Sequence, residues 1–237
     1  MKIPRSIMGL CCVVLLSACG SGGGGGDSAP AAPVPQSFPL RGAFSALFAN
    51  GETKTFAVSG TCNGTATFAQ AATVGGANFN NVAGQLSATR TVALTLTNCV
   101  LPSSNGIVGS TVYYDTNYAP LGYDSSPNPG YGVFLAPAAM PESGKVGDVG
   151  NLGTLTNYKS SAKTEAVGQT KSSYLVEADS ASSASCAIVT VIGRDFNVSD
   201  VLQTTEQDRY RIGLTGAATL ISIDIQTANG LIHLIFK

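Results

Sequence analysis

Side chains able to do catalytic chemistry are few in this sequence. His233 is the only histidine, and a Ser/His/Asp triad would have to run through it. No Gly-x-Ser-x-Gly turn holds a serine nucleophile, and a histidine-based zinc site lacks its second ligand. We therefore predict that His233 is an ordinary strand residue and that the chain carries neither a metal nor a cofactor.

Two short patterns have spacings that hydrolases use. Ser160 and Lys163 match the Ser-x-x-Lys spacing of serine acyl-enzymes, but residues 163–165 read Lys-Thr-Glu where those enzymes have Lys-Thr-Gly, and the segment is a polar loop. Glu177 and Asp179 would lie on one face of a strand, about 7 Å apart, a separation that a general acid and base could use. Carboxylates at a strand end are usually only solvated. The sequence therefore predicts a protein that is not an enzyme, with a hydrolase acting through these residues as the weakest alternative.

Tyrosines in the turn-rich residues 102–141 are the candidate ligand-binding residues. Their rings would offer stacking faces on loops, and Asp115, Asn117, Asp124 and Asn128 would offer hydrogen-bonding oxygens. Such a set holds sugars or peptide segments, and its oxygen atoms could hold calcium. The other interpretation is that alternate tyrosines fill the core while Gly and Pro shape the loops. The candidates are Tyr113, Tyr114, Tyr118, Tyr123 and Tyr131.

The composition is that of a low-charge, turn-rich exported β-protein. Charged residues are 11% of the chain, against about 25% in ordinary soluble domains. The formal net charge is -1, and no cluster of Lys and Arg is present. Binding to nucleic acid requires a basic surface. We therefore predict no nucleic-acid partner.

Three cysteines lie in the part of the sequence that should fold. Cys62 and Cys99 each end a strand-like run beside turn residues, and exported chains meet an oxidising compartment. We favour a disulfide between these two, worth about 4 kcal/mol by loop-closure entropy. Cys186 opens an apolar run and is typical of a small buried hydrophobic residue. The other pairings stay open.

Residues 37–51 have the spacing of a short helix. Leu40, Phe44, Leu47 and Phe48 recur at helical intervals, although a hairpin turning at residues 50–51 is the alternative. The period then changes to two, which predicts half-buried strands. These strands are expected at residues 53–60, 91–97, 152–158, 172–178, 187–196, 210–214, 219–226 and 231–236.

The last hairpin is the most sharply specified element. Asn229-Gly230 is the strongest two-residue turn signal, and it would pair Ile225 with Leu234 and Ile223 with Phe236 on a core face. A similar turn at residues 63–64 would separate Phe68 from Phe56 and Val58, so a bulge or longer loop is expected there.

Together the elements predict a mainly β fold. Short strands separated by turn signals favour an antiparallel sandwich or barrel-like meander with one short N-terminal helix. The Pro-rich residues 137–144 could connect two lobes, at residues 37–136 and 145–237. No repeat of fixed period is present.

The N-terminus predicts export. Lys2 and Arg5 precede an apolar run over residues 7–16, which has the form of a signal peptide ending at residue 18. The run is shorter than the roughly 20 residues that a membrane-spanning helix needs. Residues 19–36 are rich in Gly, Ser, Ala and Pro and should form an unfolded tether.

Residues Leu16, Ser17, Ala18 and Cys19 match the lipobox, so the chain resembles bacterial lipoproteins. This resemblance implies that Cys19 is lipid-modified, with palmitate among the acyl groups, and anchors the chain to a membrane. Gly20 in place of Asp implies the outer membrane, with the body facing the periplasm or the outside. The 113–122 and 146–158 stretches resemble uncharacterised Gram-negative lipoproteins and imply no activity.

These expectations lead to a non-enzymatic binding or interaction module of the cell envelope. Its ligand or partner would be an envelope protein, a glycan or a peptide. The alternatives are a structural component of an envelope assembly and, less favoured, an envelope hydrolase.

Overall fold

The computed structural model describes residues 36–100, 105–126, 130–180 and 185–237. Across these ranges the chain forms one α-helix and 13 β-strands in a single sheet. The predicted signal peptide, the lipobox with Cys19, nearly all of the tether, and Asn128 lie outside the described residues.

The elements follow one another along the chain, and the segment between β7 and β8 covers residues 135–148. Helix α1 spans Leu40–Asn50 and precedes all of the strands. The strands are β1 (Glu52–Gly60), β2 (Asn63–Gln70), β3 (Val74–Phe79), β4 (Val82–Thr97), β5 (Gly106–Tyr114), β6 (Pro120–Ser126), β7 (Gly130–Phe134), β8 (Val149–Tyr158), β9 (Ala166–Ala178), β10 (Cys186–Phe196), β11 (Leu202–Gly213), β12 (Ala218–Thr227) and β13 (His233–Phe236).

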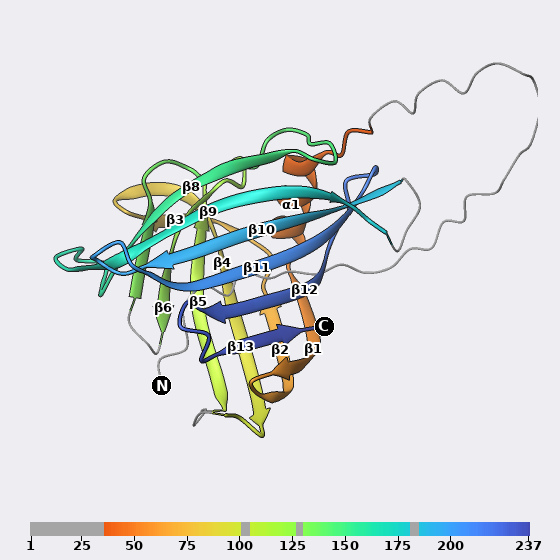
Figure 1. The fold of residues 1–237 in the computed structure, drawn as a ribbon. Helices are drawn as coiled ribbons and strands as arrows, with labels where there is room; N and C mark the ends of the chain where they lie inside the picture. Colours follow the sequence, from red (N-terminus) through yellow and green to blue (C-terminus); the bar gives the residue numbers. More distant parts are fainter. Residues whose placement is uncertain (1–35, 101–104, 127–129, 181–184) are drawn as a thin grey trace, which may run out of the picture.

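The sheet closes on itself into a barrel (Figure 1). Strands β4 to β13 form a meander, β13 pairs with β1, and β2 pairs with both β1 and β4, so that 12 strands form a closed antiparallel wall. Closure is possible because β4 is 16 residues long: it pairs with β2 along residues 90–97 and with the extra strand β3 along residues 82–87. The predicted mainly β, barrel-like antiparallel meander is confirmed.

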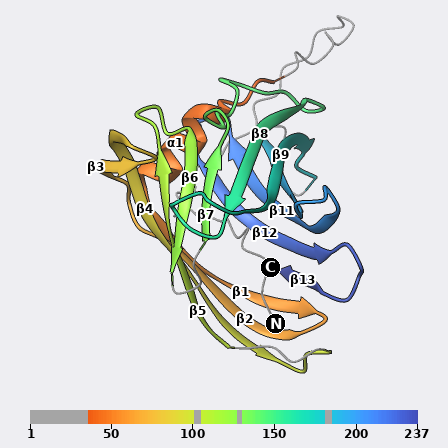
Figure 2. The same ribbon diagram turned by 90° about the vertical axis from the view of Figure 1, so that its left-hand side faces the viewer.

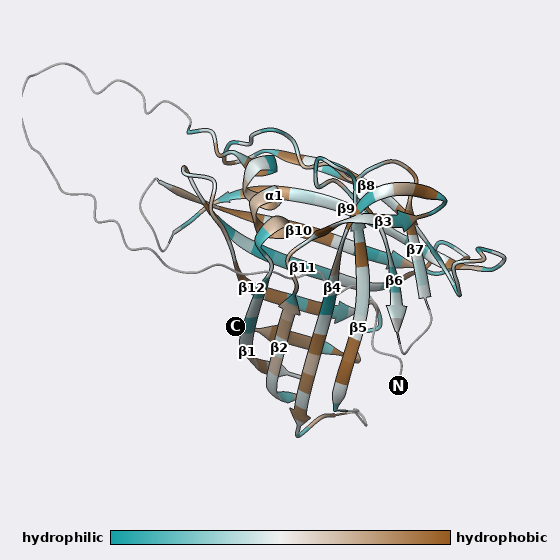
Figure 3. Cartoon of the chain, turned by 180° about the vertical axis from the view of Figure 1, so that it is seen from behind, coloured by the Kyte–Doolittle hydropathy of each residue, from teal (hydrophilic) through white to brown (hydrophobic). Residues whose placement is uncertain are grey.

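Alternation along the strands separates a buried lumen face from the outer face. In β4, Val92, Leu94 and Leu96 are buried, whereas Thr95 and Thr97 are exposed, as predicted. Hydrophobic residues alternate with more polar ones along β4 and β5 in Figure 3. The core therefore lies inside the barrel.

The β12–β13 hairpin has the predicted register. Ile225 pairs with Leu234 and Ile223 with Phe236, and all of these side chains are buried. The expected longer loop between β1 and β2 is also confirmed. Its register pairs Val58 with Gly64 and keeps the Phe56 and Phe68 rings in contact, with their centroids 5.6 Å apart.

Helix α1 lies at one end of the barrel and fills part of the lumen (Figure 2). The Phe44 ring packs on Tyr210 of β11 at 4.9 Å, and the Phe48 ring packs on Tyr114 of β5 at 4.7 Å, so the helix contacts two separate walls. Gly51 ends the helix at φ +67°, where a side chain would collide with backbone atoms of the loop after β2. The helix is confirmed in place of a hairpin, and it is not long and apolar enough to cross a membrane.

The predicted disulfide between Cys62 and Cys99 is confirmed. It joins the turn between β1 and β2 to the residues after β4, two segments separated by 37 positions in sequence. Cys186 is free and half-buried at the start of β10.

Candidate functional site

The barrel lumen contains a cavity of about 700 Å³ between α1 and the wall. One side is formed by the helix, another by the loops around residues 115–120 and 134–142, and the base by β8 to β11. Ligand sites of proteins have volumes of about 300–1,000 Å³ and are mostly apolar with a few placed polar groups. The apolar lining residues include Phe44, Phe48, Tyr118, Phe134, Ala138, Met140, Leu152 and Val191.

An acidic pair on β11 lies at the base of this cavity. Glu206 and Asp208 are two positions apart, so both side chains project into the lumen, and both are buried. Asp208 lines the cavity and is 3% exposed. Tyr210, two positions further, donates a hydrogen bond from its hydroxyl to Asp208 Oδ2 at 3.4 Å. Among the described residues, Asp208 Oδ1 has no hydrogen-bond partner.

Burial raises the pKa of Asp208 to about 8, while the positive charge of Arg90 and hydrogen bonds from Glu206 and Tyr210 act in the opposite direction. A hydrogen bond between two carboxyl groups requires a proton between them. The Glu206–Asp208 pair therefore holds one proton near neutral pH. Burial and the same acids raise the pKa of Tyr210 well above its ordinary value, which keeps its hydroxyl a donor.

The counter-charge comes from Arg90 on β4. Its Nε donates to Gln70 Oε1 at 2.5 Å, and its second guanidinium nitrogen donates to the Tyr114 hydroxyl at 3.0 Å. Arg90 is 6% exposed and Tyr114 is fully buried. The guanidinium is thus held in place by neighbouring strands, close enough to the acidic pair to stabilise one negative charge there.

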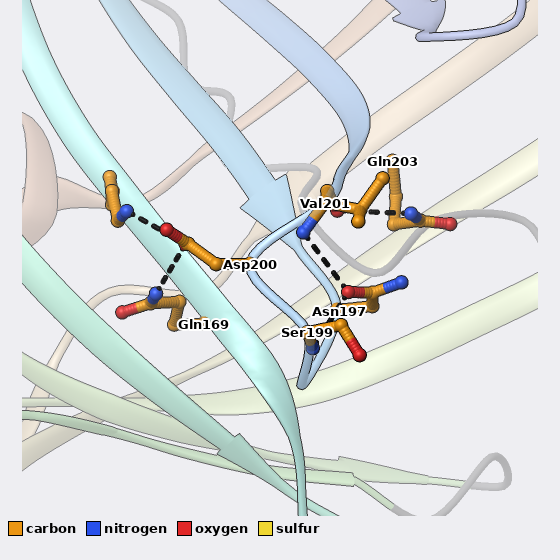
Figure 4. Close-up of polar contacts among 7 residues, drawn as sticks. Gln169, Asn197, Ser199, Asp200, Val201 and Gln203 are labelled. Carbon is orange, nitrogen blue, oxygen red and sulfur yellow. Dashed lines mark hydrogen bonds and ion pairs between the residues drawn. The ribbon is translucent and has the colours of Figure 1, made fainter.

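The turn between β10 and β11 sets which residues of β11 face the lumen. Asn197 Oδ1 accepts hydrogen bonds from the backbone amides of Ser199 and Val201, and Asp200 Oδ1 accepts one from Gln169 Nε2 at 2.9 Å (Figure 4). Asp200 has φ +57°, which a tight turn of this kind requires. Because a slip of one residue would turn every side chain of β11 to the other face, this turn positions Glu206 and Asp208.

The five candidate tyrosines do not form one site. Four of them lie in strands, so the expectation that their rings sit on loops is wrong for all but Tyr118. Tyr114 and Tyr123 face the lumen, and the Tyr123 hydroxyl donates to Asn157 Oδ1 at 2.8 Å. Tyr113 and Tyr131 pack against Phe79 of β3 on the outer face, because β5 and β7 alternate. Tyr118 alone among them lines the cavity.

The polar residues predicted beside the tyrosines serve local structure. Asp115 Oδ1 accepts hydrogen bonds from the amides of Asn117 and Ala119, both at 2.8 Å, and so holds the loop that edges the cavity. Asp124 is exposed on β6. Within the described residues, no group of three or more His, Cys, Asp or Glu side chains is placed to hold a metal ion.

The patterns with hydrolase spacing lie away from the cavity. Glu177 is 3.5 Å from an Arg209 nitrogen, and Asp179 Oδ2 is 2.5 Å from Arg211 Nε, so each carboxylate has its own arginine. Residues 160–163 form a surface turn closed by a backbone hydrogen bond of 3.0 Å, not the start of a helix. His233 Nε2 lies 3.0 Å from Asp224 across the last hairpin.

Sequence reasoning missed Arg90, Glu206 and Asp208. The expected strand at residues 210–214 begins too late, since β11 starts at Leu202. A signal was present: continuing the period of two backwards from the apolar Ile212 and Tyr210 puts Asp208 and Glu206 on the same face. This signal was concealed because charged residues occupy both the lumen face and the outer face of the strand.

Compared with known proteins, the chain matches no family model, no curated protein and no solved structure. The cavity and its acidic base are therefore the features from which a function can be argued.

Proposed function

We propose that this chain is a non-enzymatic, lipid-anchored binding protein of the cell envelope whose barrel holds a small, largely apolar ligand in its lumen. The observation that supports the proposal is the cavity of about 700 Å³, lined mainly by apolar side chains, with one buried carboxyl group at its base. An apolar ligand leaves water on entering such a cavity, which is favourable by about 25 cal/mol per Å² of apolar surface buried.

The lining favours a small apolar ligand over the glycan or peptide considered from the sequence. Sugars need many hydrogen-bonding side chains, whereas apolar residues form the larger part of this lining, beside polar residues such as Ser45, Asn117 and Ser172. The lipid anchor is a separate part of the proposal. It rests on the Leu16-Ser17-Ala18-Cys19 pattern and the tether after it.

Binding is tested with N-phenyl-1-naphthylamine, an apolar probe that fluoresces when it leaves water. The wild-type chain should give a saturable rise in fluorescence. Gly42 lines the cavity, and a Cβ added to it would meet nothing within 4 Å. Gly42→Phe should therefore place a ring in the cavity without backbone strain and weaken binding at least about tenfold.

Gly42→Ala is the matched control, since it changes the same helix position without filling the cavity and should leave binding unchanged. No saturable binding to the wild-type chain would contradict the proposal and favour the structural component of an envelope assembly. Equal binding by the Phe and Ala variants would contradict the cavity as the site.

The anchor is tested by metabolic labelling with a palmitate analogue. Cys19→Ala should abolish the label and release the chain from the membrane fraction, and Cys12→Ala, within the predicted signal peptide, should not. Label that persists in Cys19→Ala would contradict the assignment of Cys19.

A further inference from the structure

The Asp208 carboxyl group is the acceptor at the base of the cavity. The residue lines the cavity and is buried, and among the described residues its Oδ1 atom has no hydrogen-bond partner in the structure. The other oxygen of the same carboxyl group accepts from Tyr210. A buried carboxyl oxygen without a donor is unfavourable, and a ligand that brings a donor to this carboxyl group removes that cost.

The charges around Asp208 favour a cationic donor. The Glu206–Asp208 pair with its one proton carries a single negative charge, which the Arg90 charge balances. An ammonium group that displaces this proton to solvent leaves the lumen neutral, because one positive charge replaces another. A carboxylate or phosphate would instead add a negative charge beside an oxygen acceptor. A desolvated charge without a counter-charge is costly, so anionic ligands are excluded.

The side chains that face Asp208 from the two adjacent strands and from α1 carry no charge. Facing groups on β10 and β12 are Val191 and Ile223, which carry no charge, and α1 presents phenyl rings. The ionisable groups around Asp208 and the cavity are Glu206, Tyr210, Arg90 and Tyr114 inside, and Arg41, Asp115, Tyr118 and Glu142 towards the outside. Arg41 and Glu142 pair with each other at 3.3 Å and are solvent-exposed. Glu52 and Lys54 of β1 lie on the same strand face as the buried Phe56 and Val58. Burial raises the pKa of Glu52 to about 7, and Lys54 Nζ donates to the Leu220 carbonyl oxygen at 2.5 Å.

The walls suit the rest of such a molecule. Phe44, Phe48 and Tyr118 line the cavity, and their rings can cover an apolar body or face an ammonium group. We propose that the ligand is a small apolar amine, bound as its ammonium form with the nitrogen donating to the Asp208 carboxyl group and the apolar body against the rings of α1. This inference rests on the proposed binding function and names the ligand class of the same cavity.

The proton exchange gives a signature that a neutral ligand lacks. Because the pKa of Asp208 is raised to about 8, ammonium binding below that pH must release a proton. Affinity for an amine should then rise about tenfold per pH unit between pH 6 and 8. A neutral donor such as an alcohol releases no proton, and its affinity should not change over this range.

Tryptamine and tryptophol are suitable probes because they differ only in bearing an ammonium or a hydroxyl group. The chain contains no Trp, so the indole fluorescence of either probe can be followed by exciting it at a wavelength that the eight tyrosines of the protein do not absorb. Tryptamine should bind the wild-type chain at least about tenfold more tightly than tryptophol at pH 8. Calorimetry at pH 6.5, in buffers of different ionisation enthalpy, should find one proton released per tryptamine and none per tryptophol.

Asp208→Asn should remove the preference for tryptamine, so that the two indoles bind with equal affinity, and should abolish proton release on tryptamine binding. Glu177→Gln is the matched control, since it removes a carboxylate from the outer face of the barrel and should change neither affinity. The calorimetric measurement on the wild-type chain needs no variant, so it decides the question even if Asp208→Asn does not fold.

Two results would overturn the amine assignment. Equal affinities for the two indoles, or tryptamine binding without proton release, would identify a neutral donor as the ligand class. If N-phenyl-1-naphthylamine binds and neither indole does, the amine assignment fails while the binding function stands. If none of the probes binds, both proposals fail.

Discussion

Two halves of the barrel lumen share strands β2 and β4 yet differ in their side chains. In the apolar half, Phe56, Phe68, Val92, Leu94 and Phe236 pack together below the helix. In the polar half, next to the cavity, the buried residues are Gln70, Arg90, Tyr114, Glu206, Asp208 and Tyr210. Along β2 and β4 the change occurs over a single step of two residues, from Phe68 to Gln70 and from Val92 to Arg90.

The difference separates stability from binding. Each buried aromatic side chain in the apolar half contributes about 1.5–3 kcal/mol through loss of contact with water. Buried ionisable groups in the polar half have been removed from water, and their mutual attraction often fails to offset that cost. We infer that the apolar half holds the barrel closed, and that the polar half lowers stability in exchange for a chemically specific surface.

The largest expected effect is that of Phe68→Ala in the apolar half. The Phe68 ring lies between Phe56 and Phe236, with both centroid distances 5.6 Å, so its removal leaves a cavity where the barrel closes. The free energy of unfolding should fall by about 3–5 kcal/mol in urea denaturation. Probe binding by the folded fraction should be unchanged. A loss of binding without a loss of stability would contradict the assignment of stability to the apolar half and of binding to the polar half.

Removal of the disulfide should have the next largest effect. The Cys62–Cys99 bond closes a loop of 37 positions at the end of the apolar half, which restricts the unfolded chain. The double variant Cys62→Ser and Cys99→Ser should lose about 2–4 kcal/mol of stability. Denaturation of the wild type with and without a reducing agent gives the same comparison. Cys186→Ser, at the free cysteine, should leave stability almost unchanged.

Asp208→Asn should raise the free energy of unfolding of the ligand-free chain, whereas substitutions in the apolar half lower it. The folded-state pKa of Asp208, about 8, lies above its unfolded value near 3.9, so between these values the folded state holds more protons. Stability of the wild type must then decrease as pH rises from 5 to 8 and level off above 8. Between pH 5 and 8 the free energy of unfolding should fall by at least about 1 kcal/mol, which corresponds to a decrease of about 2–4 °C in Tm.

Thermal unfolding across this pH range is the measurement, and the Asn variant should show a flatter curve. Burial also raises the pKa of Glu52, to about 7. Deprotonation of Glu52 therefore also lowers stability as the pH rises, and this effect remains in the Asn variant. A wild-type Tm that rises from pH 5 to 8 would contradict the protonated pair.

Gly42→Ala should have the smallest effect, and it concerns the helix that covers the polar half. Gly42 is exposed on α1 and its added Cβ would meet nothing within 4 Å. Alanine loses less backbone freedom than glycine in a helix, so stability should rise by about 0.5–1 kcal/mol in urea denaturation. A decrease in stability would mean that alanine is strained at position 42 or that its Cβ meets neighbouring atoms.

Prediction from sequence succeeded where local pattern and burial agree. The last hairpin has a turn that accepts only one register and two pairs of apolar residues that need burial, so Ile225 and Leu234 could be paired correctly. The disulfide was correct because Cys62 and Cys99 end strands that have a neighbouring strand in common, β2. For β11, Leu202–Gly213, prediction failed, since charged residues occupy both of its faces.

The sequence alone indicated eight of the strands, where the helix lies, and that a low-charge chain must bury an apolar face of each strand. It did not indicate β3 or the strands β5 to β7. The features that it indicated follow from periods of two and 3.6 residues and from turn chemistry, which act over a few residues. Only the tertiary structure decided that β2 pairs with β4 to close the barrel, and that Arg90 faces the acids of β11 across the lumen. The β2–β4 partners are 20–34 positions apart, whereas Arg90 and the β11 acids are more than 100 positions apart, as are the partners of β1 and β13. No local pattern specifies which distant strand completes the wall.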